Sequence, residues 1–346
     1  MHELDFTKGQ AAIAFRGAVP WHGLGESILP EDSVDDIRIK AGLDYDVVKT
    51  PVLYAGPGQL LDVTSSGNPD LAYVSPAATR ISKDKCVLYR SDTGDDLSVV
   101  SPQYQVVQPK QIVDFYKDLT EKFGFELEVV GALKGGRKVW ALANTNEAFA
   151  LRDDDKVKGY LLLATSYDGT MSTQARFTSV RVVCNNTLTC AVGEGRPEVS
   201  VPHSTKFDAE RVKAQLGIGA AWEGFRTAAG QAQNRLVSRD EIKRFFLDVY
   251  YDLDTDAKIA AFAQDEKNEK SLEKFFERIG NALFNSPGAH MGSAKNTLWG
   301  VLQAVTFDVD HQKGARSQDN RLNSAWFGPG EQIKRKALQR TLAMVA

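Results

Sequence analysis

Two glycine-containing turns between β-rich runs constrain the fold of this sequence more than any other feature. Gly135-Gly136 interrupts the β-rich segment 125–144, and Asp168-Gly169 interrupts the segment 156–184. Such pairs permit the positive φ angles of tight reversals, and Asp-Gly is typical of a two-residue type I′ turn. We therefore expect two hairpins, with antiparallel strands over 125–133, 137–144, 156–167 and 170–184.

Shorter β-rich runs precede these hairpins. The segment 46–54 contains Pro51, which cannot donate to a ladder, so it is expected to be an edge strand. Further runs between turn residues predict short strands over 71–74, 86–89 and 97–100.

Helical spacing of apolar residues predicts one helix over 109–123, which begins at Pro109 and stops at Gly124. After Asn185-Asn186 the chain could form either a short helix to about residue 192 or another strand, and we favour the helix. From about residue 207 the pattern is helical. Ser238 and Glu241 form a capping-box pair, and further helices are expected over 272–284, over 293–307 and from about Glu331.

These elements predict an α+β fold, with an antiparallel sheet of two hairpins followed by a mostly helical C-terminal part. The 346 residues, 42% of them hydrophobic, are enough for a sizeable core and for roughly two domains. We expect a β-rich α+β domain over 1–200 and a mostly helical region over 201–346.

The charge balance argues against a global attraction to polyanions. Lys+Arg 42 against Asp+Glu 45 gives a net charge of -3, so any nucleic-acid site must come from local segregation of charge. The first residues do not resemble a secretory signal, and the apolar runs are too short to cross a hydrocarbon layer of about 30 Å. Three cysteines without a C-x-x-C pair fit a reducing compartment. We expect a cytoplasmic protein with no membrane contact.

No motif for catalysis or cofactor binding is present. The sequence lacks helical zinc spacing, phosphate-binding glycine loops and the G-x-S-x-G nucleophile motif. Cys184, Cys190 and His203 could hold a metal, but buried thiols and an ordinary histidine are favoured. We expect no enzyme activity, no metal and no cofactor. The loop around Trp21 and His22 could form a ligand pocket, although a core-plugging tryptophan is the favoured interpretation.

Cationic side chains accompany the four central strands. They could neutralise phosphates in a groove while Tyr160 stacks on a base, although an ordinary solvated sheet face is the simpler alternative. The candidate cations are Lys134, Arg137, Lys138, Lys156, Lys158, Arg176 and Arg181.

Several short motifs, taken as a set, carry a family resemblance. They are HEL at 2–4, PWHGLG at 20–25, AGLD at 41–44, RVVCNNTL at 181–188, and His203. Together they resemble the phage/plasmid-like family of unknown function found in phages and other mobile elements. The resemblance extends over nearly the whole chain and implies a role in DNA maintenance without a known enzymatic activity.

The expected architecture is also similar to that of phage single-strand annealing proteins. This similarity implies a homo-oligomer that holds single-stranded DNA in a basic groove. Our strand assignment, and not a family motif, then selects the seven cations as backbone contacts and Asn185 as a polar partner. Our leading hypothesis is a non-enzymatic single-stranded-DNA-binding protein of this type. The alternatives are a protein-interaction or phage assembly factor, and an enzyme with a pocket at Trp21 and His22.

Overall fold

The computed structural model describes residues 6–7, 10–17, 25–55, 79–190, 198–316 and 318–346. Its centre is an eight-stranded sheet of order β12-β11-β10-β9-β8-β3-β4, with β13 paired to β11. All of its pairs are antiparallel except β3 with β4. The strands are β3 Ile13–Phe15, β4 Glu26–Ser27, β8 Glu126–Leu133, β9 Lys138–Leu151, β10 Asp155–Ser166, β11 Thr173–Arg181, β12 Asn186–Thr189 and β13 Glu198–Val201. The expected α+β fold is confirmed.

The central strands are buried on both faces, and alternation along β9 assigns each side chain to one of them. Val139, Ala141 and Ala143 belong to the larger core, on the face that we call the α2 face. Trp140 and Leu142 point the other way and pack with residues of α10, on what we call the α10 face. Helices therefore cover the sheet from both sides, which explains why its strands show so few exposed positions.

The α2 face is covered by α1 (Val34–Lys40), α2 (Pro109–Asp114), α3 (Lys117–Phe123) and α4 (Ala209–Gln215). One continuous helix over 109–123 was the wrong prediction, because the chain breaks at Phe115 and Tyr116, which are both buried. The single O–H proton of Tyr116 has two strand carbonyl oxygens as acceptors, each 2.9 Å from the hydroxyl oxygen. Gly124 ends α3 in a left-handed conformation, as expected.

The C-terminal half is helical. Its helices are α5 Ile218–Asn234, α6 Arg239–Tyr251, α7 Asp256–Ala263, α8 Glu266–Asn285, α9 Leu298–Phe307, α10 Gln318–Phe327 and α11 Pro329–Val345, with a π-helical turn at Asp308–Gln312. The capping box of Ser238 and Glu241 is confirmed at the start of α6. The helix expected from residue 293 begins later, at Leu298, because Thr297 caps it. The helical pattern expected from residue 207 gave no separate bounds for α4, α5, α7 or α10.

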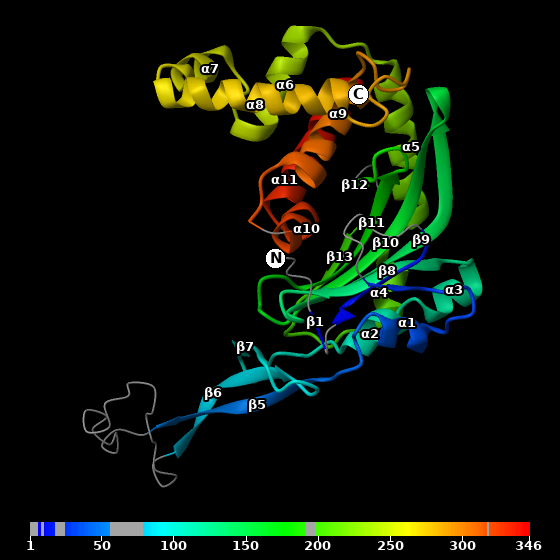
Figure 1. The fold of residues 1–346 in the computed structure, drawn as a ribbon, viewed down its shortest axis with the longest axis vertical. Helices are drawn as coiled ribbons and strands as arrows, with labels where there is room; N and C mark the ends of the chain where they lie inside the picture. Colours follow the sequence, from blue (N-terminus) through cyan, green and yellow to red (C-terminus); the bar gives the residue numbers. More distant parts are fainter. Residues whose placement is uncertain (1–5, 8–9, 18–24, 56–78, 191–197, 317) are drawn as a thin grey trace.

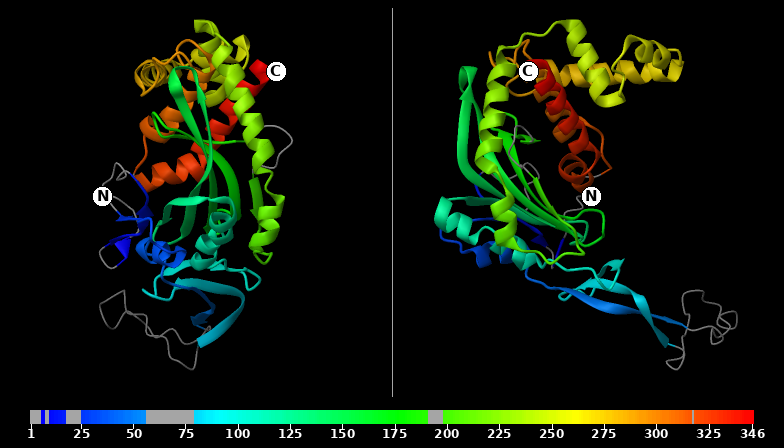
Figure 2. Two further views of the ribbon diagram at one scale, coloured as in Figure 1. Left: turned by 90° about the vertical axis from the view of Figure 1, so that its right-hand side faces the viewer. Right: turned by 180° about the vertical axis from the view of Figure 1, so that it is seen from behind.

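A separate three-stranded sheet projects from the body, and we call it the β-arm. It consists of β5 (Val47–Ala55), β6 (Thr79–Arg90) and β7 (Asp96–Val100), in the order β5-β6-β7. Figures 1 and 2 show it at the opposite end of the molecule from α6, α7 and α8. Strand β5 lies at an edge, as Pro51 predicted. A small pair, β1 (Phe6–Thr7) and β2 (Gln10–Ala11), completes the described strands.

Two local predictions are wrong. The segment after Asn185 forms strand β12 rather than a helix, because it extends the ladder along β11. The Asp168-Gly169 connection is not a two-residue type I′ turn. Strand β10 ends at Ser166 and β11 begins at Thr173, and of the pair only Gly169 has a positive φ. The strand predicted over 71–74 lies outside the described residues.

Candidate functional site

The predicted cationic residues are spread along the length of the β9–β10 hairpin, with Arg176 opposite Leu162 near its middle. Lys138 pairs with Ser166 at one end, whereas Lys156 pairs with Ala150 near the other. Ten residues of β10 separate these positions, roughly 33 Å at the usual strand rise. The expectation that these side chains converge on one open groove is therefore wrong in its geometry.

Arg181 lies in the interior instead of on an open strand face. Its side chain is 2% exposed, and Nε and Nη2 donate to the two carboxylate oxygens of Asp155 at 2.8 and 2.9 Å. Asp155 also accepts from Ser293 at 2.7 Å and from the indole N–H of Trp299 at 3.1 Å. This network satisfies both charges internally, so Arg181 joins the sheet to the segment before α9.

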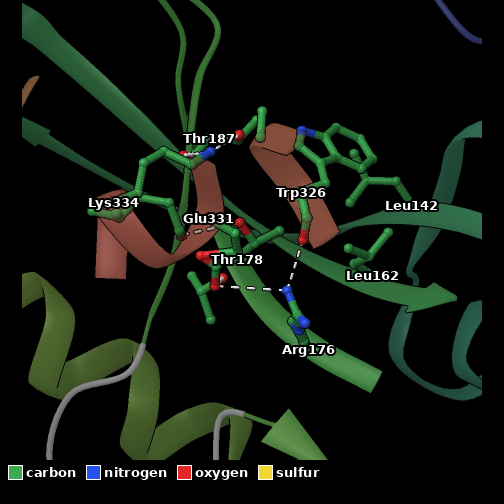
Figure 3. Close-up of a pocket in the computed structure, with 11 residues that line it drawn as sticks. Leu142, Leu162, Arg176, Thr178, Thr187, Trp326, Glu331 and Lys334 are labelled. Atoms are coloured by element: carbon green, nitrogen blue, oxygen red, sulfur yellow. Dashed lines mark hydrogen bonds and ion pairs between the residues drawn. The ribbon is translucent and has the colours of Figure 1, made fainter. Parts of the chain in front are cut away.

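Arg176 is buried in a cleft between the sheet and α10–α11, which Figure 3 shows from close by. Nη1 donates to the carbonyl of Trp326 at 2.8 Å and lies 3.6 Å from the carboxylate of Glu331. Glu198 is a second acidic neighbour, also at 3.6 Å. The prediction that Arg176 lies on a solvated strand face is wrong, because α10 and α11 cover that face.

The same cleft holds Lys334 of α11, whose side chain is 3% exposed. Its ammonium donates to Asp310 at 2.7 Å and to the carbonyl of Thr187 at 2.8 Å. The free space left among these groups is only about 20 Å³, enough for about one water molecule. The cleft is therefore a tightly packed contact between the sheet and the two helices, and it has no room for a nucleic-acid base.

Two further predicted contacts are also used internally. Lys138 is buried and donates to Asn323 at 2.7 Å, and its burial lowers the pKa of this ammonium. The hydroxyl of Tyr160 donates to Glu128 at 2.8 Å, while its ring is buried in the core on the α10 face. Burial and the nearby carboxylate raise the pKa of Tyr160. Neither side chain is placed to meet a ligand from solvent.

The remaining predicted residues are more accessible. Arg137 lies 4.0 Å from Asp96, and exposed Lys156 pairs with Asp154 at 3.1 Å. Lys134 and Lys158 are half-buried, and exposed Asn185 adopts a left-handed conformation. Trp21 and His22 lie outside the described residues.

The β-arm carries an exposed cationic patch that sequence analysis did not single out. It comprises Arg80, Lys83 and Lys85 on β6, all exposed and without an ion pair to any carboxylate of the described residues. Tyr54 of β5 lies opposite Arg80 and is 49% exposed. We call these four residues the arm patch. The signal was available in the sequence, since three cations fall within the six residues 80–85 of a β-rich run.

Pro51 explains why this part of the arm is so open. The register passes from Pro51–Cys86 directly to Leu53–Ile81, which leaves residues 82–85 of β6 in an irregular stretch opposite a single residue of β5. Proline supplies no N–H to the ladder, and such sites are typical of bulges. Strand β7 pairs only with the proximal part of β6. The distal ribbon is therefore two-stranded.

Cys184, Cys190 and His203, the residues considered for a metal or nucleophile site, do not form one. Within the described ranges, no three histidine, cysteine or acidic side chains are grouped for metal binding. Burial raises the pKa of the Cys184 and Cys190 thiols, which disfavours the reactive thiolate. His203 instead stacks on Tyr104 with the ring centroids 4.4 Å apart. No helix in the described part of the chain has the length and apolarity needed to cross a bilayer.

These observations define an α+β protein with a sheet enclosed by helices, buried ion pairs at the sheet–helix junction, and a projecting β-arm that carries a cationic patch. The chain belongs to the DUF932 family, because the model of this domain of unknown function matches residues 96–326. That range runs from the start of β7 almost to the end of α10, so it includes strands β8 to β13 of the sheet and the network of Arg181 and Asp155. Searches of curated proteins and of solved structures found no significant match.

Proposed function

We propose that this protein binds single-stranded DNA without catalysing a reaction, as a homo-oligomer of the annealing type. In this proposal it serves a phage or other mobile element in the host cytoplasm. The arm patch, rather than the central sheet, contacts the strand. The observation that supports this assignment is the exposed set of Arg80, Lys83 and Lys85 on a ribbon that projects from the body.

The electrostatic argument is local. Within residues 79–85 three cations face only one acidic residue, Asp84, whereas the whole chain has a net charge of -3. A cationic patch on a protein of negative net charge concentrates a polyanion at that patch, because the mean charge of the chain is repulsive to it. Each phosphate neutralised there releases counterions, so binding is expected to weaken steeply with salt.

The chemistry of the ribbon also suits unpaired bases. Tyr54 offers an exposed aromatic ring next to a guanidinium, and base stacking on such rings tolerates any sequence. Leu53 and Ile81 lie opposite each other and are 61% and 64% exposed. These apolar side chains can contact base faces that a duplex would hide.

The same apolar pair favours a second candidate function, a protein-interaction or assembly factor. Exposed apolar side chains on a narrow ribbon are typical of protein contacts as well. The two functions differ in their dependence on charge, because a largely apolar protein contact responds weakly to salt.

Salt-dependent binding distinguishes the two candidates. We would measure the fluorescence anisotropy of a labelled oligothymidine at about 50 and 200 mM salt with the wild type and with the triple variant Arg80→Ala, Lys83→Ala, Lys85→Ala. Three lost phosphate contacts should lower the salt slope by about 2 and weaken low-salt binding at least tenfold.

A matched control removes three positive charges at the other end of the molecule. Lys267, Lys270 and Lys274 are exposed on α8, and their replacement by alanine should leave binding within about twofold of the wild type. Thermal melting should show that both variants remain folded. No binding by the wild type at about 50 mM salt, or equal losses in the two variants, would overturn the proposal.

A further inference from the structure

A cavity of about 350 Å³ lies between the start of β12 and α10, next to the packed cleft of Figure 3. It is lined by Asn185, Thr187, Asp310, His311, Arg321 and Trp326, among others. Ligand pockets in proteins begin at about 300 Å³. The cavity therefore has room for one small ligand, unlike the neighbouring cleft.

An irregular helix forms one wall of this cavity. Helix α9 continues into the π-helical turn Asp308–Gln312, and single π turns occur often at functional sites. Asp308 anchors the turn by accepting from Arg278 at 2.6 Å and from the hydroxyl of Tyr250 at 2.7 Å. The next residues, Asp310 and His311, reach the cavity.

The acidic group of the cavity is already neutralised. One oxygen of Asp310 accepts from Lys334 at 2.7 Å, and the other accepts from the backbone N–H of Thr187 at 2.8 Å. With both oxygens occupied and its charge balanced, this carboxylate has little capacity left for a cationic ligand.

The positive charge of Arg321 is the unbalanced one. Its guanidinium donates to the carbonyl of His311, but its Nε is buried without a hydrogen-bond partner. It forms no ion pair with a carboxylate among the described side chains. A buried donor without a partner costs about 1–3 kcal/mol. Because Arg321 also lines the cavity without an ion pair among the described side chains, an anion bound there would balance its charge.

We propose that this cavity binds a nucleotide, with the phosphate at Arg321. Arginine suits phosphate oxygens because its planar fork donates several hydrogen bonds. Trp326 contributes an aromatic ring to the cavity, and the amide of Asn185 can both donate to and accept from a base edge.

The choice of a nucleotide as the ligand rests on the proposed function. A free nucleotide and one nucleotide unit of a bound single strand present the same phosphate and base. It does not depend on the arm patch. The β-arm projects from the body, away from α10 (Figure 1), so the two sites can be tested separately.

Calorimetric titration of the full chain with deoxyadenosine monophosphate tests the cavity. Deoxyadenosine and inorganic phosphate, titrated in parallel, separate the contributions of base and phosphate. The wild type should bind the monophosphate at least tenfold more tightly than either fragment. Arg321→Ala should weaken monophosphate binding at least tenfold, while Arg321→Lys should retain an intermediate affinity and show that the loss reflects charge rather than misfolding.

Arg316→Ala is the matched control, because Arg316 is exposed on the connection before α10 and does not line the cavity. It should bind within about twofold of the wild type. No binding of the monophosphate at millimolar concentration, equal affinity for inorganic phosphate, or unchanged binding by Arg321→Ala would overturn the proposal.

The arm variant separates this inference from the proposed function. If the arm triple variant loses oligonucleotide binding but keeps the monophosphate, both proposals stand. If the wild type binds the monophosphate but no oligonucleotide, the cavity binds a free nucleotide and the proposed function fails alone. If the oligonucleotide binds through the arm and the monophosphate does not bind, the cavity assignment fails alone.

Discussion

The guanidinium of Arg181 and the carboxylate of Asp155 face each other across the β10–β11 pair through two hydrogen bonds, at 2.8 and 2.9 Å. Both side chains are almost completely buried. Because Asp155 also accepts from Ser293 and Trp299, this pair connects the sheet to the segment that leads into α9. An arginine whose sequence context predicts a DNA contact therefore stabilises the junction of the two parts of the fold.

Replacing Asp155 by alanine should destabilise the protein by about 3–5 kcal/mol, because Arg181 would remain as an unpaired buried charge. Urea unfolding followed by circular dichroism would measure this change. Asp154→Asn removes the charge of a neighbouring acidic group whose partner, Lys156, is exposed. Asparagine tolerates the left-handed backbone at this position, so the substitution should cost less than about 1 kcal/mol. Equal effects of the two substitutions would contradict the assigned role of the buried pair.

Two helical glycines should respond to alanine in opposite directions. A Cβ at Gly300 of α9 would lie 1.9 Å from the carbonyl oxygen of Ala294, whereas a Cβ at Gly280 of α8 would meet nothing within 4 Å. Gly300→Ala should destabilise the fold by at least the roughly 1–3 kcal/mol that is typical of overpacking. Gly280→Ala should stabilise it by about 0.5–1 kcal/mol. Thermal melting of the two variants tests this, and a stable Gly300→Ala protein would show that α9 packs differently.

Stability should fall as the pH drops below about 6.5, partly because of His203. Burial lowers the pKa of this imidazole in the folded state, whereas its pKa in the unfolded chain is about 6.5. Between the two values the unfolded state binds more protons, so acidification favours unfolding. His203→Gln should reduce the loss of stability between pH 7 and 5.5. A pH profile identical to that of the wild type would argue against this assignment.

The hairpins were predictable because their signals are local. Turn residues such as Gly135-Gly136 and the alternation along each strand act over a few positions, and the structure places β8 to β11 where they indicate. The break at Phe115 and Tyr116 was not predictable, since it depends on core contacts with strands further along the chain.

The burial of the cationic residues depends on partners that are distant in sequence. Alternation along β11 separated Arg176 from Phe177, but no local pattern shows that α10 and α11 cover the Arg176 side. Its partner Glu331 is 155 positions away in sequence, and Lys334 meets Thr187 across 147 positions. A predicted surface charge can thus become a buried ion pair through tertiary packing alone.

Crosslinking would show whether the β-arm, and not the central sheet, contacts single-stranded DNA. A thiothymidine-labelled oligonucleotide would be irradiated with the protein at about 50 mM salt, and the crosslinked peptides mapped by mass spectrometry. The proposal predicts crosslinks at Tyr54 and in the segment 79–85, lost in the arm triple variant. Crosslinks confined to the strand that carries Arg176 and Arg181, or none at all, would contradict it.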